Sequence, residues 1–422
     1  MEKGAVIGLG YVGLPLLVEI ANSGFIGIGI DVVEEKVKMV NRGESYISDV
    51  KSSELKKLVE AGKIRATTNF DILKEVDAIS ICVPTPLRKT RDPDISYIIA
   101  SVDEISKRLR KGQLIILEST TYPGNTDEIL LPEFSKRGFK VGKDFFLAFS
   151  PERVDPGNKI YYTKNTPKIV GGVTPACTKK AVDYYKKIFD KVIPVSSTKC
   201  AEMVKLLENT FRSVNIGMVN EMALMCDKLG VNVWEVIEAA ATKPFGFMPF
   251  YPGPGLGGHC IPIDPLYLSW KLKALNYNAK FIEMASEINA NMPAYVVQKI
   301  ANALNEKGKP LKDSSILIIG VAYKRNVSDI RESPALDVIL LLKERGSIIA
   351  YNDPYIPEIN ERDLKLKSVP LAMENLKNAD CAVIITDHSS YNMKQICKYA
   401  PLIVDTRNAT KNIKGSAKIV LL

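Results

Sequence analysis

The amino-acid sequence predicts an α/β protein in which two doubly wound domains are joined by a central region of long helices. Three observations predict this fold. Short apolar runs alternate with helical patterns over residues 1–195, a mostly helical stretch follows over residues 196–307, and a second, smaller alternation occupies residues 308–422. We expect these ranges to be three domains. At about 100–200 residues per domain, a chain of 422 residues has room for them.

The N-terminal domain is predicted from short runs rich in Val, Ile and Leu, which are typical of strands buried on both faces of a parallel sheet. Amphipathic stretches between the runs are typical of crossover helices. The expected strands are Ala5–Gly8, Gly27–Ile30, Ala78–Val83, Leu114–Leu117, Phe145–Phe149 and Ile169–Gly171.

The central region is predicted to be helical because apolar residues recur at helical spacing, with no Pro and one Gly from Lys199 to Leu229. Long helices gain stability mainly by packing, so we expect a homodimer interface here. Pro293 is expected to kink the last of these helices. The expected helices are Lys199–Leu229, Val233–Ala241, Leu266–Leu275 and Ala279–Leu304.

The C-terminal domain begins after a linker signal, Gly308-Lys309-Pro310. Apolar runs bounded by turn residues then alternate with a helical pattern over Pro334–Arg345. The expected strands are Ser315–Gly320, Ser347–Tyr351, Cys381–Thr386 and Leu402–Asp405.

The charge and the cysteines narrow the classes of function. Lys and Arg number 57 against 48 Asp and Glu, a formal charge of +9 that is spread along the chain and suits an anionic small molecule. A nucleic-acid binder would need a basic stripe or an aromatic platform, and neither is evident. The seven Cys form no CxxC pair, which indicates reduced thiols and a cytoplasmic location. Neither a signal peptide nor a membrane span is expected.

The segment from Gly8 to Gly13 reads Gly-Leu-Gly-Tyr-Val-Gly, between an expected strand and an expected helix. Such glycines permit a tight turn and a close approach to a pyrophosphate at the helix N-terminus, the fingerprint of a Rossmann-like dinucleotide site. Asp31 ends the second strand, where a carboxylate binds a ribose diol and repels a 2′-phosphate, so NAD is favoured over NADP. A flavin site is less favoured, since nothing further in the sequence resembles one.

Residues 253–265 form a loop dense in Gly and Pro with Cys260 near its centre. An inert thiol is a poor fit to such a loop, and a zinc site lacks further ligands. A Cys–His dyad with His259 or His388 remains an alternative. Beside an NAD site, a nucleophilic Cys has a specific use: it captures an aldehyde as a thiohemiacetal, which is oxidised to a thioester and then hydrolysed to an acid.

These motifs together resemble the UDP-glucose/UDP-N-acetylhexosamine 6-dehydrogenases over nearly the whole chain. The resemblance rests on six segments: Gly8–Gly13, Ser150–Arg153, Lys205–Asn209, Gly257–Asp264, Gly320–Lys324 and Arg331–Ser333. It implies an NAD-dependent, four-electron oxidation of a sugar C6 hydroxyl to a uronic acid, performed by a homodimer without a metal.

The resemblance also implies roles for individual residues. The catalytic set is Cys260 as nucleophile, Lys205 and Asn209 at the oxyanion, Asp264 holding a lysine and a water, Glu152 as the base for hydrolysis, and Thr120 at a catalytic water. The implied NAD contacts are Gly8, Gly10, Tyr11, Val12, Gly13, Asp31, Lys36, Thr85, Thr120 and Arg331. The implied substrate contacts are Glu152, Arg153, Lys205, Asn209, Tyr251, Gly257, Lys324 and Arg407.

The sugar is read from two loops, residues 149–158 and 243–255, which look most like the UDP-N-acetylglucosamine (UDP-GlcNAc) branch. The UDP-glucose branch has a second acidic residue in place of Pro156 and a partner-subunit Arg near the position of Pro244. UDP-GlcNAc is therefore the expected substrate, and UDP-N-acetylmannosamine and UDP-glucose remain open. A non-catalytic nucleotide-sugar sensor is the alternative from another class.

Overall fold

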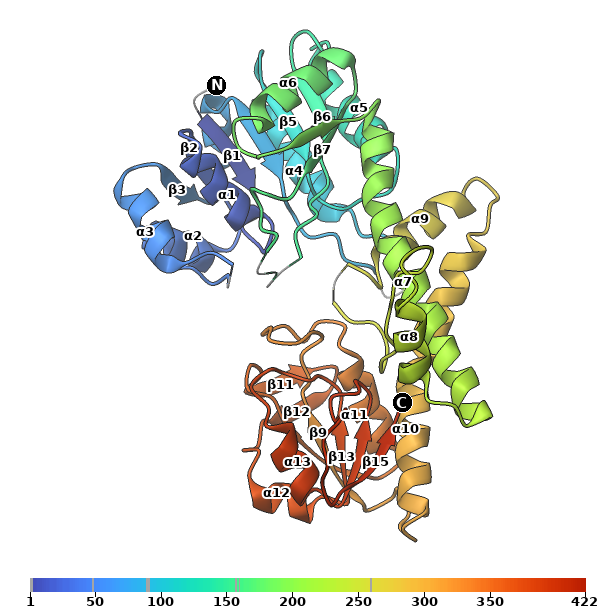
Figure 1. Ribbon diagram of the computed structural model, residues 1–422. Helices are drawn as coiled ribbons and strands as arrows, with labels where there is room; N and C mark the ends of the chain where they lie inside the picture. Colours follow the sequence, from blue (N-terminus) through green and yellow to red (C-terminus); the bar gives the residue numbers. More distant parts are fainter. Residues whose placement is uncertain (1–2, 48, 89–91, 156–157, 159, 259) are drawn as a thin grey trace. The chain divides into compact units, whose positions relative to one another are not determined.

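The computed structural model describes residues 3–47, 49–88, 92–155, 158, 160–258 and 260–422. It divides into two compact units. Unit 1 comprises Met1–Glu208 with Leu266–Asn278, and unit 2 comprises Asn209–Pro265 with Ala279–Leu422. Each unit is built on one main sheet (Figure 1).

The main sheet of unit 1 has eight strands among the described residues, in the order β3-β2-β1-β4-β5-β6-β7-β8. Its first six strands are parallel and follow the order 3-2-1-4-5-6 of a dinucleotide-binding fold. This confirms the predicted α/β fold class. The strands are β1 (Lys3–Ile7), β2 (Ile26–Ile30), β3 (Ile64–Thr67), β4 (Ala78–Ile81), β5 (Leu114–Leu117), β6 (Phe146–Phe149), β7 (Lys168–Gly172) and β8 (Val192–Pro194).

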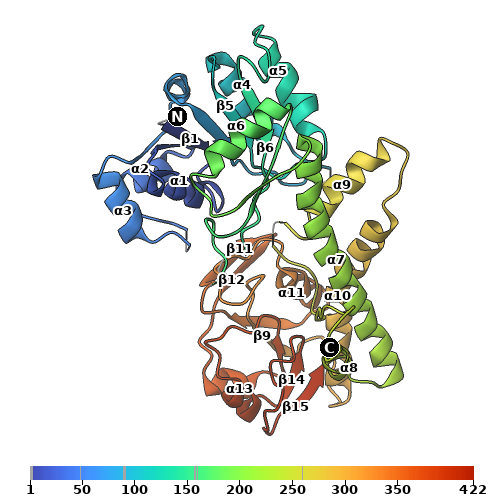
Figure 2. The same cartoon turned by 45° about the horizontal axis from the view of Figure 1, so that its top comes forward.

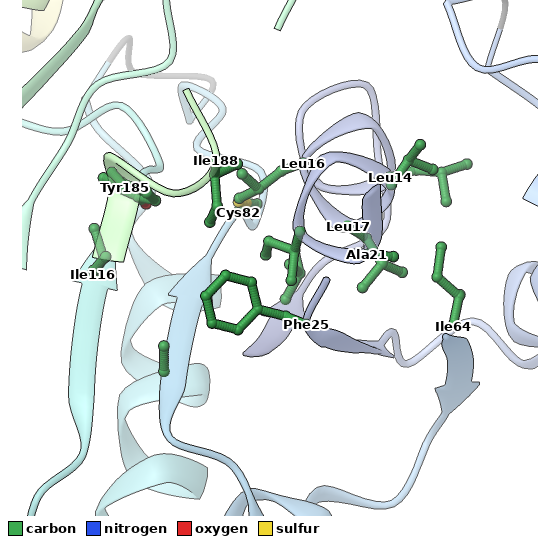
Figure 3. Packing of buried hydrophobic residues seen from close by; sticks show 14 of the residues in the cluster. Leu14, Leu16, Leu17, Ala21, Phe25, Ile64, Cys82, Ile116, Tyr185 and Ile188 are labelled. Carbon is green, nitrogen blue, oxygen red and sulfur yellow. The ribbon is translucent and has the colours of Figure 1, made fainter. Parts of the chain in front are cut away.

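Helices cover both faces of this sheet because successive strand residues point to opposite sides. Val6 joins an apolar cluster with α1, α2, α3 and α6, whereas Ala5 and Ile7 join another with α4 and α5. Figure 3 shows Leu14, Leu16 and Leu17 of α1 in the first cluster, together with Tyr185 of α6. The helices are α1 (Gly13–Asn22), α2 (Glu34–Asn41), α3 (Ser52–Glu60), α4 (Ser96–Arg108), α5 (Leu131–Ser135) and α6 (Pro175–Tyr185), with short 3-10 and π turns at η1 (Phe70–Glu75) and η2 (Thr126–Leu130).

The strand register aligns the carboxyl ends of the parallel strands in one row. Ile7 pairs with Ile30 on one side and with Ile81 on the other. Leu117 continues the row between Ile81 and Phe149. The residues that follow each strand therefore share one edge of the sheet, where ligands bind in open α/β folds.

The run Ile169–Gly171 was expected to be a parallel strand, which is correct for its pairing with β8 and wrong for its pairing with β6. It forms the middle of β7, which pairs antiparallel with β6 through Phe149 and Gly171. The described residues between β6 and β7 contain no helix, and a parallel connection needs a crossover. The chain therefore turns back, and the start of β7 lies at the carboxyl edge of β6.

The predicted central helices are present with shifts of a few residues at their ends. They are α7 (Thr198–Leu229), α8 (Val233–Ala241), α9 (Asp264–Lys273) and α10 (Lys280–Asn305). The helix α10 continues through Pro293. The unit boundary falls within α7, between Glu208 and Asn209.

Unit 2 contains a five-stranded parallel sheet in the order β10-β9-β13-β14-β15 (Figure 2). Helices α10 and α11 (Pro334–Glu344) cover one face, and α12 (Met373–Asn378) and α13 (Met393–Tyr399) cover the other. The strands are β9 (Ser315–Ile319), β10 (Ile348–Asn352), β13 (Cys381–Ile384), β14 (Leu402–Asp405) and β15 (Lys418–Leu421), with a separate antiparallel pair of β11 (Glu358–Glu361) and β12 (Leu364–Lys367).

Candidate active site

The fingerprint glycines lie where the sequence predicts, between β1 and α1. Gly8 has φ +90°, and a Cβ there would lie 2.6 Å from the Cys82 carbonyl oxygen. A Cβ at Gly13 would lie 1.8 Å from the Gly8 carbonyl oxygen, whereas a Cβ at Gly10 would meet no atom within 4 Å. Two glycines thus allow close packing, and the third leaves open space for a ligand.

The N-terminus of α1 suits a pyrophosphate. Among the described side chains, none caps this helix at Val12, and Tyr11 is partly exposed beside it. Free N–H groups at a helix N-terminus attract anions. The residues present therefore fit the dinucleotide that the fingerprint predicts.

Asp31 lies at the end of β2 and is 7% exposed. Its Oδ2 accepts a hydrogen bond of 2.8 Å from the Leu9 N–H, and its Oδ1 accepts one of 2.9 Å from the Val33 N–H. The Lys36 Nζ lies 3.4 Å from the same Oδ2. A carboxylate has about four acceptor positions, so these contacts fix Asp31 beside the fingerprint and leave acceptor capacity for a ribose diol.

Thr85 and Thr120 follow β4 and β5 at the carboxyl edge of the sheet, and both are partly buried. The Thr85 carbonyl accepts a hydrogen bond of 3.0 Å from the Tyr267 hydroxyl. The loop after Thr120 is held by Glu202 of α7, which accepts from the N–H groups of Gly124 and Thr126. The sequence analysis missed Glu202. Its role is indicated in the sequence only by an acidic residue on a helix face that is otherwise buried.

Glu152 lies in the loop after β6. Its Oε1 accepts hydrogen bonds of 2.7 Å from the N–H groups of Arg153 and Val154. The Lys205 Nζ donates to the Glu152 carbonyl oxygen at 2.7 Å, and Arg153 pairs with Glu208. Three of the predicted catalytic and substrate residues, Glu152, Arg153 and Lys205, therefore meet in unit 1.

A buried ionic cluster that the sequence analysis did not find adjoins Glu152. The Lys168 Nζ lies 2.6 Å from Glu118 Oε2 and 3.2 Å from Glu152 Oε2. Burial alone favours a neutral Glu152, but the Lys168 charge and the two backbone N–H groups outweigh it and hold the pKa of Glu152 below its ordinary value. In the sequence, this cluster is indicated only by Lys168, which begins an apolar strand, and by Glu118, which follows one.

In unit 2, the Cys260 loop is packed on the segment that follows β9. The Gly258 N–H donates to the Arg331 carbonyl oxygen at 3.1 Å. A Cβ at Gly257 would lie 2.8 Å from the Tyr323 Cβ, and one at Gly258 would lie 2.9 Å from the Tyr323 ring. Gly257, a predicted substrate contact, thus has a packing role here, and the glycines let the loop lie flat on Tyr323.

Cys260 is partly exposed and lies four residues before the start of α9 at Asp264. Its carbonyl accepts a hydrogen bond of 2.8 Å from the Asp264 N–H, the first residue of that helix. The Asp264 carboxylate is buried and accepts from Asn209 Nδ2 at 2.5 Å, so these two predicted catalytic residues form a pair.

A pocket of about 290 Å³ in unit 2 contains two of the predicted substrate residues, Tyr251 and Arg407. Tyr251 stacks on Trp234, with ring centroids 6.1 Å apart. Burial lowers the pKa of Arg407 to about 10, which still leaves the guanidinium charged at neutral pH. Among the described groups, the Trp234 Nε1–H is buried without a hydrogen-bond partner. The full lining is Trp234, Glu238, Tyr251, Pro252, Asp387, Arg407 and Asn408.

Two buried asparagines that the sequence analysis missed hold the loop before Cys260. Asn220 of α7 accepts from the Gly253 N–H at 2.9 Å, and its Nδ2 donates to Asn289 of α10. A Cβ at Gly253 would lie 2.6 Å from the Arg407 guanidinium. The loop position therefore depends on polar contacts between helices that are distant in sequence.

The Cys–His alternative that uses His388 is not favoured by the structure. Both ring nitrogens of His388 are engaged: Nδ1 accepts from the Asn326 N–H at 2.9 Å, and Nε2 lies 3.0 Å from Asp353 Oδ2. His259 and Pro156 lie outside the described residues. Within the described ranges, no cluster of three or more His, Cys, Asp or Glu side chains has the geometry to hold a metal ion. Nor does any helix in those ranges have the length and apolarity to cross a membrane.

The predicted residues are divided between the units. Unit 1 holds Gly8, Gly10, Tyr11, Val12, Gly13, Asp31, Lys36, Thr85, Thr120, Glu152, Arg153 and Lys205. Unit 2 holds Asn209, Tyr251, Gly257, Cys260, Asp264, Lys324, Arg331 and Arg407. The side chain of Arg331 pairs with Asp329.

The fold and the fingerprint define a dinucleotide-binding protein with a second domain of nucleotide-binding type. The sequence matches all three domains of one family: the NAD binding domain over residues 2–189, the central domain over 199–291 and the UDP binding domain over 317–412. The chain therefore belongs to the UDP-glucose/GDP-mannose dehydrogenase family, which confirms the resemblance seen in the sequence and identifies NAD as the cofactor.

Several curated relatives and solved structures are similar over most of their length. The UDP-N-acetyl-D-mannosamine dehydrogenase of Methanococcus maripaludis is 36% identical over all of this chain and 97% of the relative. The UDP-N-acetyl-D-glucosamine 6-dehydrogenase of Pseudomonas aeruginosa is 34% identical over 84% of this chain and 83% of the relative. The structure of the UDP-D-ManNAc dehydrogenase of Pyrococcus horikoshii matches with a TM-score of 0.91 and 34% identity, over 99% of this chain and 98% of that one.

Proposed function

We propose that this chain oxidises the C6 hydroxyl of a UDP-N-acetylhexosamine to the uronic acid, with two NAD and a covalent Cys260 thioester. Membership of a family with NAD-binding and UDP-binding domains supports the substrate class and the cofactor. The single observation that carries the mechanism is Cys260, partly exposed before α9 in a glycine loop that packs on the UDP-binding domain.

The chemistry requires one nucleophile and one base. NAD, when bound, would supply the hydride acceptor for both oxidations, and the hydroxyl proton released in each oxidation passes to a base or to solvent. The Cys260 thiolate adds to the C6 carbonyl of the aldehyde, which forms the C–S bond of a thiohemiacetal. After the second oxidation the C–S bond belongs to a thioester. Water adds to its carbonyl carbon, the C–S bond breaks, Cys260 leaves as a thiolate, and the product is a carboxylate.

We assign the remaining roles from the residues that match the family's motifs. Lys205 and Asn209 lie one turn apart on α7 and are proposed to stabilise the developing oxyanion. Asp264 is proposed to orient Asn209, in keeping with their hydrogen bond. Glu152 is proposed as the base that activates water, and Thr120 as the hydroxyl that holds a catalytic water.

The nucleotide part of the substrate is proposed to contact Lys324, Arg407 and Tyr251. Arg407 and Tyr251 line one pocket, which supports a shared ligand. A charged guanidinium suits a phosphate, and an aromatic face suits a base. We keep residues 1–195, 196–307 and 308–422 as the proposed cofactor, central and nucleotide-sugar domains.

The proposed sugar is an N-acetylhexosamine, with UDP-N-acetylmannosamine as the first candidate. Most of the named relatives, including those of Methanococcus maripaludis and Escherichia coli, carry that substrate in their names. UDP-GlcNAc, which the two loops favour, is the second candidate and has a relative of similar identity.

We also propose a cytoplasmic homodimer that pairs through α7. Phe211, Met218 and Met225 recur every seven residues and are each more than 40% exposed, so they form an apolar row on one side of the helix. All seven cysteines are free thiols, in keeping with a reducing compartment. Light scattering after gel filtration should show a dimer that Met218→Glu weakens and that Arg212→Glu leaves intact.

The direct test of the substrate is NADH formation with a panel of UDP-N-acetylmannosamine, UDP-GlcNAc, UDP-N-acetylgalactosamine and UDP-glucose. The proposal expects one of the first two to give the highest kcat/KM. Tight binding of UDP-sugars with no NADH from any of them would replace the proposal with a nucleotide-sugar sensor.

A further inference from the structure

Two members of the buried cluster beside Glu152, Lys168 and Glu118, have no part in the roles assigned above. The side chains of Lys168 and Glu118 are 4% and 0% exposed, and that of Glu152 is 15% exposed. Burying charges is costly unless each is paired and hydrogen-bonded. The three buried charges therefore depend on one another, and removing one alone is expected to destabilise the fold.

Each carboxylate oxygen in this cluster has a donor. Glu118 Oε2 accepts from Lys168, and Glu118 Oε1 accepts from the Tyr185 hydroxyl. Glu152 Oε2 accepts from Lys168 at 3.2 Å, while Glu152 Oε1 takes the two backbone N–H groups of its own loop. The Glu152 carboxylate is therefore held at both oxygens, and among the described side chains Lys168 is its charged donor.

The antiparallel pairing of β7 explains why Lys168 reaches Glu152. Phe149 pairs with Gly171, and Ala148 with Gly172, so the register extended past the strand end sets Glu152 opposite Lys168. A parallel strand would have put the start of β7 at the other end of the sheet. The reversed strand thus delivers an ammonium group to the edge where the cofactor motifs lie.

We propose that Lys168 is a positioning residue that keeps the Glu152 carboxylate ionised and oriented for the hydrolysis step, and that Glu118 and Tyr185 hold the Lys168 ammonium in place. This proposal rests on the proposed function, in which Glu152 takes a proton from the water that adds to the Cys260 thioester. The proton goes from water to the carboxylate, the new C–O bond forms, and the C–S bond breaks.

The electrostatics agree with this arrangement. Burial opposes the charge on Lys168, yet Glu118 and Glu152 together raise the pKa of its ammonium above the ordinary value. Lys168 thus stays charged wherever Glu152 is ionised. The charged or titratable groups around Glu152 are Lys168 of β7, Glu118 after β5, Cys82 after β4, Tyr185 of α6, Lys205 of α7, and Arg153 beside it.

The test compares four proteins: wild type, Lys168→Arg, Lys168→Met/Glu118→Gln and Lys180→Met. The double variant removes Lys168 without leaving Glu118 as an unpaired buried charge, which protects the fold. Lys180 is the matched control, because it lies on α6 with its Nζ 5.3 Å from the Phe146 ring. The measurements are the pH profile of kcat, the NADH burst in the first turnover, and the mass of the protein during turnover.

In the double variant we expect the acid limb of kcat to move up by about 1–3 pH units, because an opposite charge at this distance is lost. Hydrolysis should slow on the order of 10-fold at neutral pH, because the Glu152 carboxylate is no longer held in position and a well-placed general base contributes about 100- to 10,000-fold. The NADH burst should then precede a slow steady state, with a thioester adduct on the protein. Lys168→Arg should restore most of the acid limb, and Lys180→Met should match wild type.

The outcomes separate the two levels of the proposal. An active wild type whose double variant shows an unmoved acid limb and no burst overturns the role of Lys168 alone. A wild type that makes no NADH from any UDP-sugar in the panel overturns the function on which that role rests.

Discussion

Gly13→Ala is expected to damage both the fold and NAD binding. A Cβ at position 13 would lie 1.8 Å from the Gly8 carbonyl oxygen, where real Cβ atoms keep at least 3.0 Å, so the backbones must separate by about 1.2 Å. Gly8 has little room to retreat, because its own Cβ position lies 2.6 Å from the Cys82 carbonyl. Because the clash is between two backbone segments, we expect Gly13→Ala to lower the free energy of unfolding by about 3 kcal/mol, the upper end of the usual cost of overpacking. That corresponds to a loss of roughly 6–12 °C in Tm for a unit of this size.

The assay pairs thermal unfolding by circular dichroism with calorimetric titration of NAD. Gly10→Ala is the matched control, because its Cβ meets no atom within 4 Å. It should keep the wild-type Tm and lose NAD affinity, since the methyl group fills the space left for the pyrophosphate. Gly13→Ala should lose both. A Gly13→Ala protein with wild-type Tm and wild-type NAD affinity would refute this account of the fingerprint.

Three further predictions concern single side chains. Asp31→Asn should weaken NAD binding by about 10–100-fold, because hydrogen bonds between the ribose diol and a charged carboxylate are lost. It should also reduce the preference for NAD over NADP, measured as the Kd of each dinucleotide. An unchanged ratio of the two Kd values would contradict this. Although burial opposes its charge, hydrogen bonds from His388 and from the N–H groups of Val321 and Ala322 lower the pKa of Asp353 in the folded protein. Ionised Asp353 therefore stabilises the fold above the pKa of the unfolded state, and this stabilisation is lost as pH falls through the lower pKa of the folded state. Asp353→Asn should cost about 1–3 kcal/mol at pH 7 and flatten the loss of Tm below pH 4, and an acid limb identical to wild type would count against it. Cys260→Ala should abolish steady-state NADH formation while NAD and UDP still bind by calorimetry, whereas turnover at the wild-type rate would exclude Cys260 as the nucleophile.

The local elements were predictable because their signals are local. The runs Leu114–Leu117, Val233–Ala241 and Leu402–Asp405 coincide with β5, α8 and β14. The short strands β3, β11 and β12 were missed because polar or charged residues interrupt the apolar ones and no long apolar run marks them. The pairing of these strands depends on their neighbours in space, which sequence periodicity does not report.

The site residues were predictable where they belong to a sequence motif. They were not predictable where strand pairing brings them together. The fingerprint and Asp31 lie together as expected, and Asn209 meets Asp264. Lys168 was missed because β7 was expected to be parallel, and only the antiparallel pairing brings Lys168 to Glu152. Asn220 and Asn289 come from two helices about 70 residues apart, and their hydrogen bond exists only after the helices pack. The roles assigned to these residues stay predictions.

The four-electron mechanism predicts a fixed stoichiometry. The decisive measurement is the amount of NADH formed per UDP-N-acetylhexosamine consumed, followed by absorbance with limiting sugar and excess NAD. The account predicts two NADH per sugar and a uronic acid as the product. One NADH per sugar, with an aldehyde or ketone as the product, would contradict it.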